Sequence, residues 1–335
     1  MKKKKMVLSC VFFILLIALT LYVIFSNYDI NTIYNNMLLV KPIYLVGCLL
    51  LVCLYFIFQG IYMKYILHAL DVETTLKKCT FYSVIEFFFS AITPSSTGGQ
   101  PVQMYYMSKD KIPMRKSLIV LILNTIIFKL YLIVGGILIL IFRPDYIFES
   151  RLLIQIFFYL GILIDALVIL GCYMLMYHKK IIKQAATIFY KLKKLILKKD
   201  YDSNRLDELL SKYVNEAKFI NSHVKEIVIS VILTFIQRTL MFSILYMLYR
   251  SFGFKEYTYL EILLLQIFVQ ISIEGLILPG GVGASEYVST HMYNVIFGSL
   301  SISGMILTRT LSFYIPLLVI MFIIGIVTKI KYMKD

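Results

Sequence analysis

Charged residues are scarce in this sequence, and their scarcity excludes a soluble fold. Asp, Glu, Lys and Arg make up 16% of the 335 residues, whereas 60% of the residues are hydrophobic and the mean hydropathy is +0.82. Soluble domains average about 25% charged and about 45–50% apolar residues. The chain is therefore expected to be an integral membrane protein.

Several motifs that would carry chemistry are also missing. The cysteines show no CxxC spacing, and the histidines have no HExxH-like neighbour, so the sequence predicts no metal site, no disulfide framework and no cofactor. A GxxxxGK[ST] loop is absent, which excludes transport driven by a nucleotide bound through such a loop. No acyl-transfer nucleophile with a nearby base stands out. The scattered residues are Cys10, Cys48, Cys53, Cys79, Cys172, His68, His178, His223 and His291.

The net charge of +15 does not indicate nucleic-acid binding, because the basic residues fall in short runs between apolar stretches. The first such run, MKKKK, precedes an apolar stretch of about 20 residues without an A-x-A cleavage site. We therefore interpret this stretch as a retained first helix and not as a secretory signal.

Eight apolar regions decide the topology. A helix needs about 20 apolar residues to cross a hydrocarbon core of about 30 Å. Six segments meet that length, and two further regions, 81–107 and 258–298, are interrupted near the middle by proline and glycine. The six full spans are expected at 6–26, 42–67, 117–142, 151–176, 227–249 and 302–328.

The distribution of Lys and Arg favours re-entrant hairpins for both interrupted regions. If each hairpin enters and leaves on one side, 26 of the 34 Lys and Arg residues are cytoplasmic, 5 are external and 3 lie within spans. If 81–107 crossed completely, the basic segments 108–116 and 177–226 would both move outside, against the positive-inside rule. We therefore expect both termini in the cytoplasm.

The two hairpins then predict an inverted repeat within a single membrane domain, 1–335. Repeat one covers about 42–142 and repeat two about 227–328, each as a full span, a broken hairpin and a full span; 151–176 links them. The fold class is an all-α polytopic membrane protein with six full spans and two re-entrant hairpins. Paired broken helices in inverted repeats indicate a transport site near the membrane midplane.

The two breaks read AITPSSTGGQPVQMYY (91–106) and EGLILPGGVGASEY (274–287). A new half-helix can start near Gln100 in the first and near Ala284 or Ser285 in the second, so that free N–H groups face a cavity and favour a phosphate or carboxylate. Gly98 and Gly281 are expected to have positive φ or to admit a ligand close to the backbone. The candidate substrate-binding residues are Ser95, Ser96, Thr97, Gly98, Gly99, Gln100, Gln103, Pro279, Gly280, Gly281, Gly283, Ser285, Glu286, Arg238 and Arg309.

Charged residues within the apolar regions are further candidates, because a charge at the bilayer centre costs at least about 2.5–3.5 kcal/mol. Three cations and four carboxylates suggest mutual pairing, either as structural ion pairs between helices or as substrate-binding groups. Arg238 and Arg309 share an R-T-L context and suit bidentate phosphate binding. Glu286, at a half-helix start, could instead receive a lipid amino group. The remaining charges are Lys129, Glu86, Asp165 and Glu274.

The segment 177–226 contains KKIIKQAATIFYKLKKLILKK at 179–199. Its apolar residues fall on one helical face with lysines opposite, which predicts a basic amphipathic helix on an anionic lipid surface. A partner-binding helix is the alternative.

Both motifs together resemble the membrane-domain family of lysylphosphatidylglycerol synthetase/flippases, over about residues 6–330. The resemblance rests on TPSSTGGQPVQMYYM (93–107), LPGGVGASE (278–286) and the segment 309–316, and it departs from the family in having Gln100 and Gln103 where many members carry charged residues. It implies a bacterial cell-membrane flippase for anionic or aminoacylated phospholipid, or for a polyprenyl-phosphate-linked lipid.

Two alternatives remain. One is a phosphatidylglycerol lysyltransferase or its membrane subunit, connected with cationic peptide and antibiotic resistance; because the chain ends at KIKYMKD soon after the last span, we expect no lysyl transfer by the chain alone. The other is a scaffold that recruits a separate lipid synthase through the basic segment. Oligomeric state, lipid identity and energy source are left open.

Overall fold

The computed structural model describes residues 30–93, 97–178, 180–184, 187, 210–218, 223–275 and 284–331. Within these ranges the chain is helical and contains no strand. The expected first span (6–26), the tips of both interrupted regions and most of the basic amphipathic segment lie outside the described residues. The prediction of an all-α fold is confirmed.

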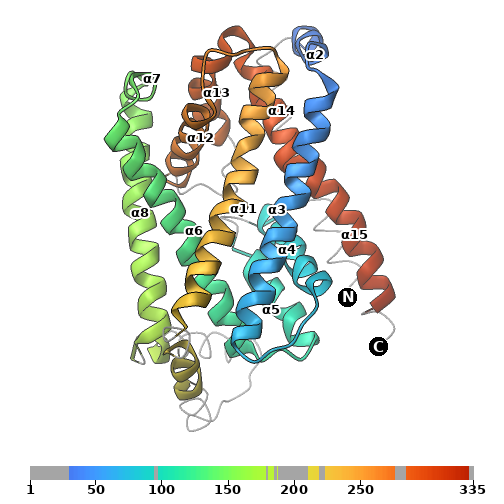
Figure 1. Cartoon of the computed structure of the whole chain (residues 1–335), viewed down its shortest axis with the longest axis vertical. Coiled ribbons are helices and arrows are strands. Elements are labelled where there is room, and N and C mark those ends of the chain that lie inside the picture. The colour runs from blue at the N-terminus through green and yellow to red at the C-terminus, as the bar shows by residue number, and fades with distance from the viewer. Residues whose placement is uncertain are drawn as a thin grey trace.

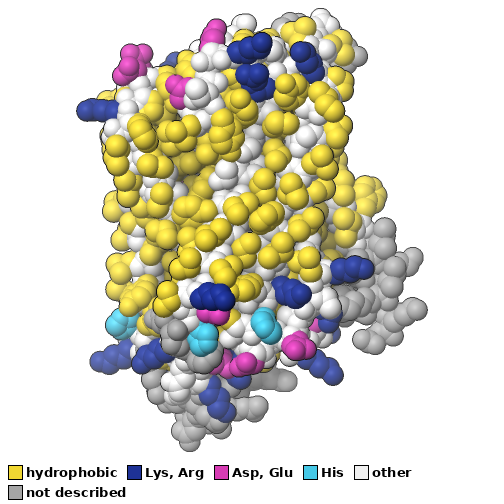
Figure 2. All heavy atoms as spheres, in the orientation of Figure 1, with side chains coloured by type: hydrophobic (Ala, Val, Ile, Leu, Met, Phe, Trp, Pro, Cys, Tyr) yellow, Lys and Arg dark blue, Asp and Glu magenta, His cyan; other side chains and the backbone are white. Residues whose placement is uncertain are grey.

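Five helical runs within the described ranges are long and apolar enough to cross a membrane: Pro42–Ala69 (α3), Met114–Phe142 (α6), Leu152–Tyr177 (α8), Val224–Ser251 (α11) and Ser285–Ile324. At about 1.5 Å per residue, even the 26 residues of α8 reach about 39 Å, more than the hydrocarbon core of about 30 Å. Exposed Leu, Ile and Val side chains cover these helices. Figure 2 shows this surface as a hydrophobic belt, with charged side chains gathered above and below it. The chain is a multi-pass membrane protein.

Four shorter helices fill the two interrupted regions: α4 (Leu76–Ala91), α5 (Gly99–Lys109), α12 (Tyr259–Glu274) and α13 (Ala284–Phe297). The two longest, α4 and α12, have 16 residues each and cover about 24 Å, which is less than the hydrocarbon thickness. The helices α4 and α5 run antiparallel, because the end of α4 packs against the start of α5, where a Cβ on Gly99 would lie 2.6 Å from the carbonyl oxygen of Glu86.

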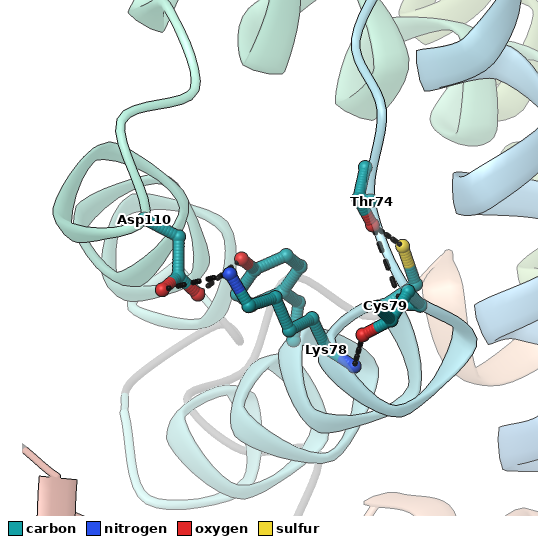
Figure 3. A network of polar contacts seen from close by, with 6 residues as sticks. Thr74, Lys78, Cys79 and Asp110 are labelled. Carbon is teal, nitrogen blue, oxygen red and sulfur yellow. Dashed lines mark hydrogen bonds and ion pairs between the residues drawn. The ribbon is translucent and has the colours of Figure 1, made fainter.

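The opposite ends of α4 and α5 are joined by polar contacts of Asp110, which follows α5. Its carboxylate pairs with Lys78 at 3.4 Å and accepts a hydrogen bond from the Tyr82 hydroxyl at 2.5 Å. Figure 3 shows Lys78 and Asp110 pointing toward one another, beside the contact between Thr74 and Cys79. These contacts lie where the chain arrives from α3 and leaves for α6, at the lower end of the molecule in Figure 1.

The second pair, α12 and α13, lies at the upper end in Figure 1. Helix α12 begins with a capping box, in which the Thr258 hydroxyl accepts from the Glu261 amide and the Glu261 carboxylate accepts from the Thr258 amide. The Tyr293 hydroxyl of α13 donates to Gln266 of α12 at 2.6 Å. The pair therefore occupies the end of the molecule opposite to α4 and α5.

The chain then descends through one interrupted helix. The turn Gly298–Leu300, with φ of 53° at Gly298, leads into α14 (Ser301–Arg309). A π-helical turn, Thr310–Tyr314, follows directly after Arg309 and precedes α15 (Ile315–Lys331). Together α14, this turn and α15 cover the predicted span 302–328.

Both ends carry elements outside the expected spans. At the upper end, the short helices α2 (Ile30–Leu38) and α7 (Asp145–Phe148) form, and the Asn36 amide donates to the Ser303 hydroxyl at 3.3 Å. At the lower end, the Arg115 Nε atom lies 2.9 Å from both carboxylate oxygens of Glu216. This pair places two segments that the charge count assigned to the same side, 108–116 and part of 177–226, against one another.

Candidate functional site

The charged side chains inside the apolar belt form three clusters, each at an inner region of a short helix. In the first, the Lys129 cluster, the ammonium of Lys129 on α6 lies 2.8 Å from Asp165 on α8 and also contacts Glu274, the last residue of α12. The Gln270 amide donates to the other Glu274 oxygen at 2.9 Å. One lysine therefore pairs with carboxylates from two further helices.

The Arg309 cluster lies where α13 begins. The Arg309 guanidinium is 3.2 Å from the Glu286 carboxylate and donates to the Ser285 hydroxyl, which in turn donates to Glu286 at 3.1 Å. Both charged side chains retain some exposure, 22% for Arg309 and 12% for Glu286. Because Glu286 lies in the first turn of α13, the helix dipole also stabilises its negative charge.

The Arg238 cluster lies against the end of α4. Arg238 of α11 donates to the Tyr55 hydroxyl at 3.2 Å and stacks on the ring of Phe128, 3.8 Å from its centroid. Glu86 of α4 accepts a hydrogen bond from Ser90 at 3.0 Å and lies close enough to Arg238 to interact with it electrostatically. Within 4.0 Å, however, no ion pair joins Glu86 to Arg238 among the described residues.

These clusters share one pattern. The helices α4, α12 and α13 of the interrupted regions each supply a glutamate, and α11, α6 and α14 each supply a cation that interacts with it. The fourth carboxylate, Asp165, comes from α8, which is the linking helix between the two expected repeats. Sequence separations of 145 residues, as between Lys129 and Glu274, explain why the sequence could predict pairing but not the partners.

One expectation for the first motif, a positive φ at Gly98, differs from the structure. Gly98 has φ of −84°, so positive φ is wrong at this position. The side chain is excluded by crowding instead, because a Cβ on Gly98 would lie 2.4 Å from Cγ2 of Thr93, whose hydroxyl accepts from the Gly98 amide at 2.9 Å. Gln100 donates to Thr125 of α6 at 2.9 Å, and Gln103 is buried against Met63.

Six predicted binding residues, Ser95, Ser96, Pro279, Gly280, Gly281 and Gly283, lie outside the described residues. Thr97 is described and lies in the turn before α5. Within the described ranges, no hydrogen bond joins Gln100 or Gln103 to Arg309. The first motif contacts α3, α4 and α6, and the second contacts α14.

The family described as Lysylphosphatidylglycerol synthase TM region matches residues 6–320. The chain belongs to this family. No curated protein and no solved structure matches it. As a member of the lysylphosphatidylglycerol synthase membrane-region family, it is a membrane protein related to lysylphosphatidylglycerol synthesis or translocation, and it interacts with membrane phospholipid.

Several further polar residues line the interior of this family member, and the sequence analysis did not identify them. Gln59 on α3 and Gln237 and Thr234 on α11 are buried, and their side-chain oxygens have no hydrogen-bond partner among the described residues. Buried polar groups normally find partners, so such a set indicates an interior suited to polar atoms. The signal was present in the sequence, as glutamine and threonine within two of the predicted spans, 42–67 and 227–249.

A pocket of about 410 Å³ opens at the upper end of the molecule, and the three clusters do not line it. Its lining includes Arg151, His291 of α13 and Tyr146, whose hydroxyl donates to the Glu261 carbonyl at 3.1 Å. Arg151 donates to the Tyr287 hydroxyl at 3.3 Å. The pocket thus adjoins the helix that begins at the Arg309 cluster.

Proposed function

We propose that the chain translocates a phospholipid, moving an anionic or aminoacylated head group through its interior while the acyl chains stay in the bilayer. The head group is lysylphosphatidylglycerol-like, or the phosphate of a polyprenyl-linked lipid. The observation that carries this proposal is the set of paired charges at the inner regions of α4, α12 and α13. Ionisable groups at membrane depth are costly and mark substrate or ion paths.

The proposal includes a topology. The pairs α4–α5 and α12–α13 are re-entrant hairpins that enter from opposite membrane sides, and the units 42–142 and 227–328 form an inverted repeat. Each of these four helices is too short to cross the membrane by itself, and the two pairs lie at opposite ends of the molecule. We assign the lower end to the cytoplasm of a bacterial cell, because the segments rich in Lys and Arg belong to it.

The Arg309 cluster supplies the head-group chemistry. Arg309 presents a planar fork of donors that fits two phosphate oxygens, so an arriving phosphate can replace Glu286 and Ser285 as its partner. The released Glu286 carboxylate can then bind the amino group of a zwitterionic or aminoacylated lipid. The unpaired oxygens of Gln59, Gln237 and Thr234 offer acceptors to the same polar group.

The test is a head-group-accessibility assay in liposomes that contain the purified chain and several labelled lipids. Arg309→Gln should abolish translocation of anionic lipid, while Arg309→Lys should retain part of it, because lysine keeps the charge but loses the fork. Glu286→Gln should slow the translocation of lipids that carry an amino group more than it slows the translocation of phosphatidylglycerol. Folded Arg309→Gln protein with normal translocation would refute the assignment.

The family description names a synthase, and the same preparation tests that activity. Purified chain is incubated with radiolabelled lysyl-tRNA and phosphatidylglycerol, and the lipids are separated. We expect no lysyl lipid. Labelled lysylphosphatidylglycerol would assign the synthase activity to this chain in place of translocation.

A further inference from the structure

The three clusters contain four carboxylates and three cations, and Asp165 is the carboxylate that has no cation of its own. The three glutamates of the short helices each face their own cation, but Asp165 shares Lys129 with Glu274. Its side chain is 0% exposed, and apart from the Lys129 ammonium no group donates a hydrogen bond to it among the described residues. Two carboxylates and one ammonium leave this site with one net negative charge.

The neighbouring groups do not supply the missing positive charge. On α8 the next titratable side chain near Lys129 is Cys172, and on α12 the neutral Gln270 faces Glu274. From α11, Arg238 lies over the Phe128 ring, 3.8 Å from its centroid, and Lys129 lies 5.3 Å from the same centroid. Arg238 interacts electrostatically with Glu86 of α4 and makes no ion pair with Asp165 or Glu274 among the described residues.

We propose that Asp165, Lys129 and Glu274 bind one proton between the two carboxyl groups, and that its binding and release drive lipid translocation. Two carboxylates held together in a poorly solvated site cannot both stay ionised beside a single cation. The shared proton supplies the hydrogen bond that Asp165 lacks and makes the cluster neutral. The coupling rests on the proposed function, whereas the proton site itself does not.

A proton fits this site better than a metal cation. The Lys129 ammonium already occupies the position between the two carboxylates, where a metal ion would need to bind. Among the described residues no group of three or more His, Cys, Asp or Glu side chains is arranged to hold a metal. A proton needs only the space between two oxygens.

The site can be tested without any lipid substrate. Infrared difference spectra of the protein in nanodiscs should show a protonated carboxyl signal that is lost in Asp165→Asn and also in Glu274→Gln, because either change leaves one carboxylate for one lysine. Asp145→Asn, at an exposed carboxylate of α7, is the matched control and should retain the signal. Both cluster variants are neutral without a proton and are expected to fold. A signal that persists in both variants would overturn the proton site.

Coupling is tested in liposomes with an imposed pH difference. If one proton accompanies each lipid, a difference of one pH unit should shift the steady-state lipid ratio between leaflets about tenfold. Asp165→Asn should still exchange lipid downhill but should not respond to pH. Translocation that is indifferent to pH, or that follows only a sodium gradient, would reject the coupling and leave the proposed function intact. If no lipid moves, the proposed function fails while the infrared result still decides the proton site.

Discussion

Gly161 is the position at which one methyl group should disturb the interior most directly. A Cβ at this residue of α8 would lie 2.0 Å from the carbonyl oxygen of Ile271 on α12. Ordinary contact begins at about 3.4 Å, so α12 would have to move by roughly 1.4 Å. Because Glu274 follows Ile271 by one turn, and Asp165 follows Gly161 by one turn, the same shift separates the Lys129 cluster.

The expected cost follows from overpacking, which amounts to about 1–3 kcal/mol, reduced by at most about 1 kcal/mol for the better helix propensity of alanine. Gly161→Ala should therefore lower the free energy of unfolding by about 1–2 kcal/mol. The matched control is Gly171→Ala on the same helix, where no atom lies within 4 Å of the added Cβ. That variant should be neutral or more stable by up to about 1 kcal/mol.

Reversible unfolding in mixed micelles, followed by circular dichroism, measures both variants side by side. The two alanine variants should differ by about 1–3 kcal/mol, equivalent to roughly a fivefold to hundredfold difference in the unfolding equilibrium constant. A Gly161→Ala protein as stable as Gly171→Ala would show that α8 and α12 are not held in this close contact, and the geometry of the Lys129 cluster would then need to be revised.

Two further predictions concern a helix cap and the topology. Thr258→Ala removes the hydroxyl of the α12 capping box and should cost about 1 kcal/mol in thermal unfolding experiments, whereas Thr258→Ser should be nearly neutral; equal stability of the two variants would mean that the box contributes nothing. In a cysteine-less background, a membrane-impermeant reagent applied to intact cells should label Lys255→Cys and leave Ser108→Cys unlabelled. External labelling at position 108 would contradict the re-entrant assignment of α4 and α5.

Hydropathy predicted the long helices well, because the length of an apolar run is a property of the local sequence. The breaks at 91–106 and 274–287 also fall where α4 and α12 end, since proline and glycine act on the backbone locally. The sequence could not predict which of the charged residues pair with one another. Nothing near Lys129 in the sequence points to Asp165 and Glu274, because the contact depends on how α6, α8 and α12 pack.

Two glycine contacts were missed for the same reason. Gly161 and Gly275 were not singled out, although a Cβ on Gly275 would lie 2.2 Å from the Phe157 carbonyl oxygen. Small residues permit close helix approach in membranes, but many glycines in apolar helices make no such contact. Gly171 has open space around it, although its sequence surroundings are as apolar as those of Gly161.

The π-helical turn Thr310–Tyr314 sets the rotational phase between the two halves of the last long helix. A π turn holds one residue more than an α turn, and one residue corresponds to about 100° of rotation about the helix axis. If this turn relaxed to α geometry, Arg309 could not keep facing Glu286 while Leu317 and Ile320 stayed buried in the core. The surplus residue thus lets Arg309 face Glu286 while Leu317 and Ile320, beyond the turn, stay in the core.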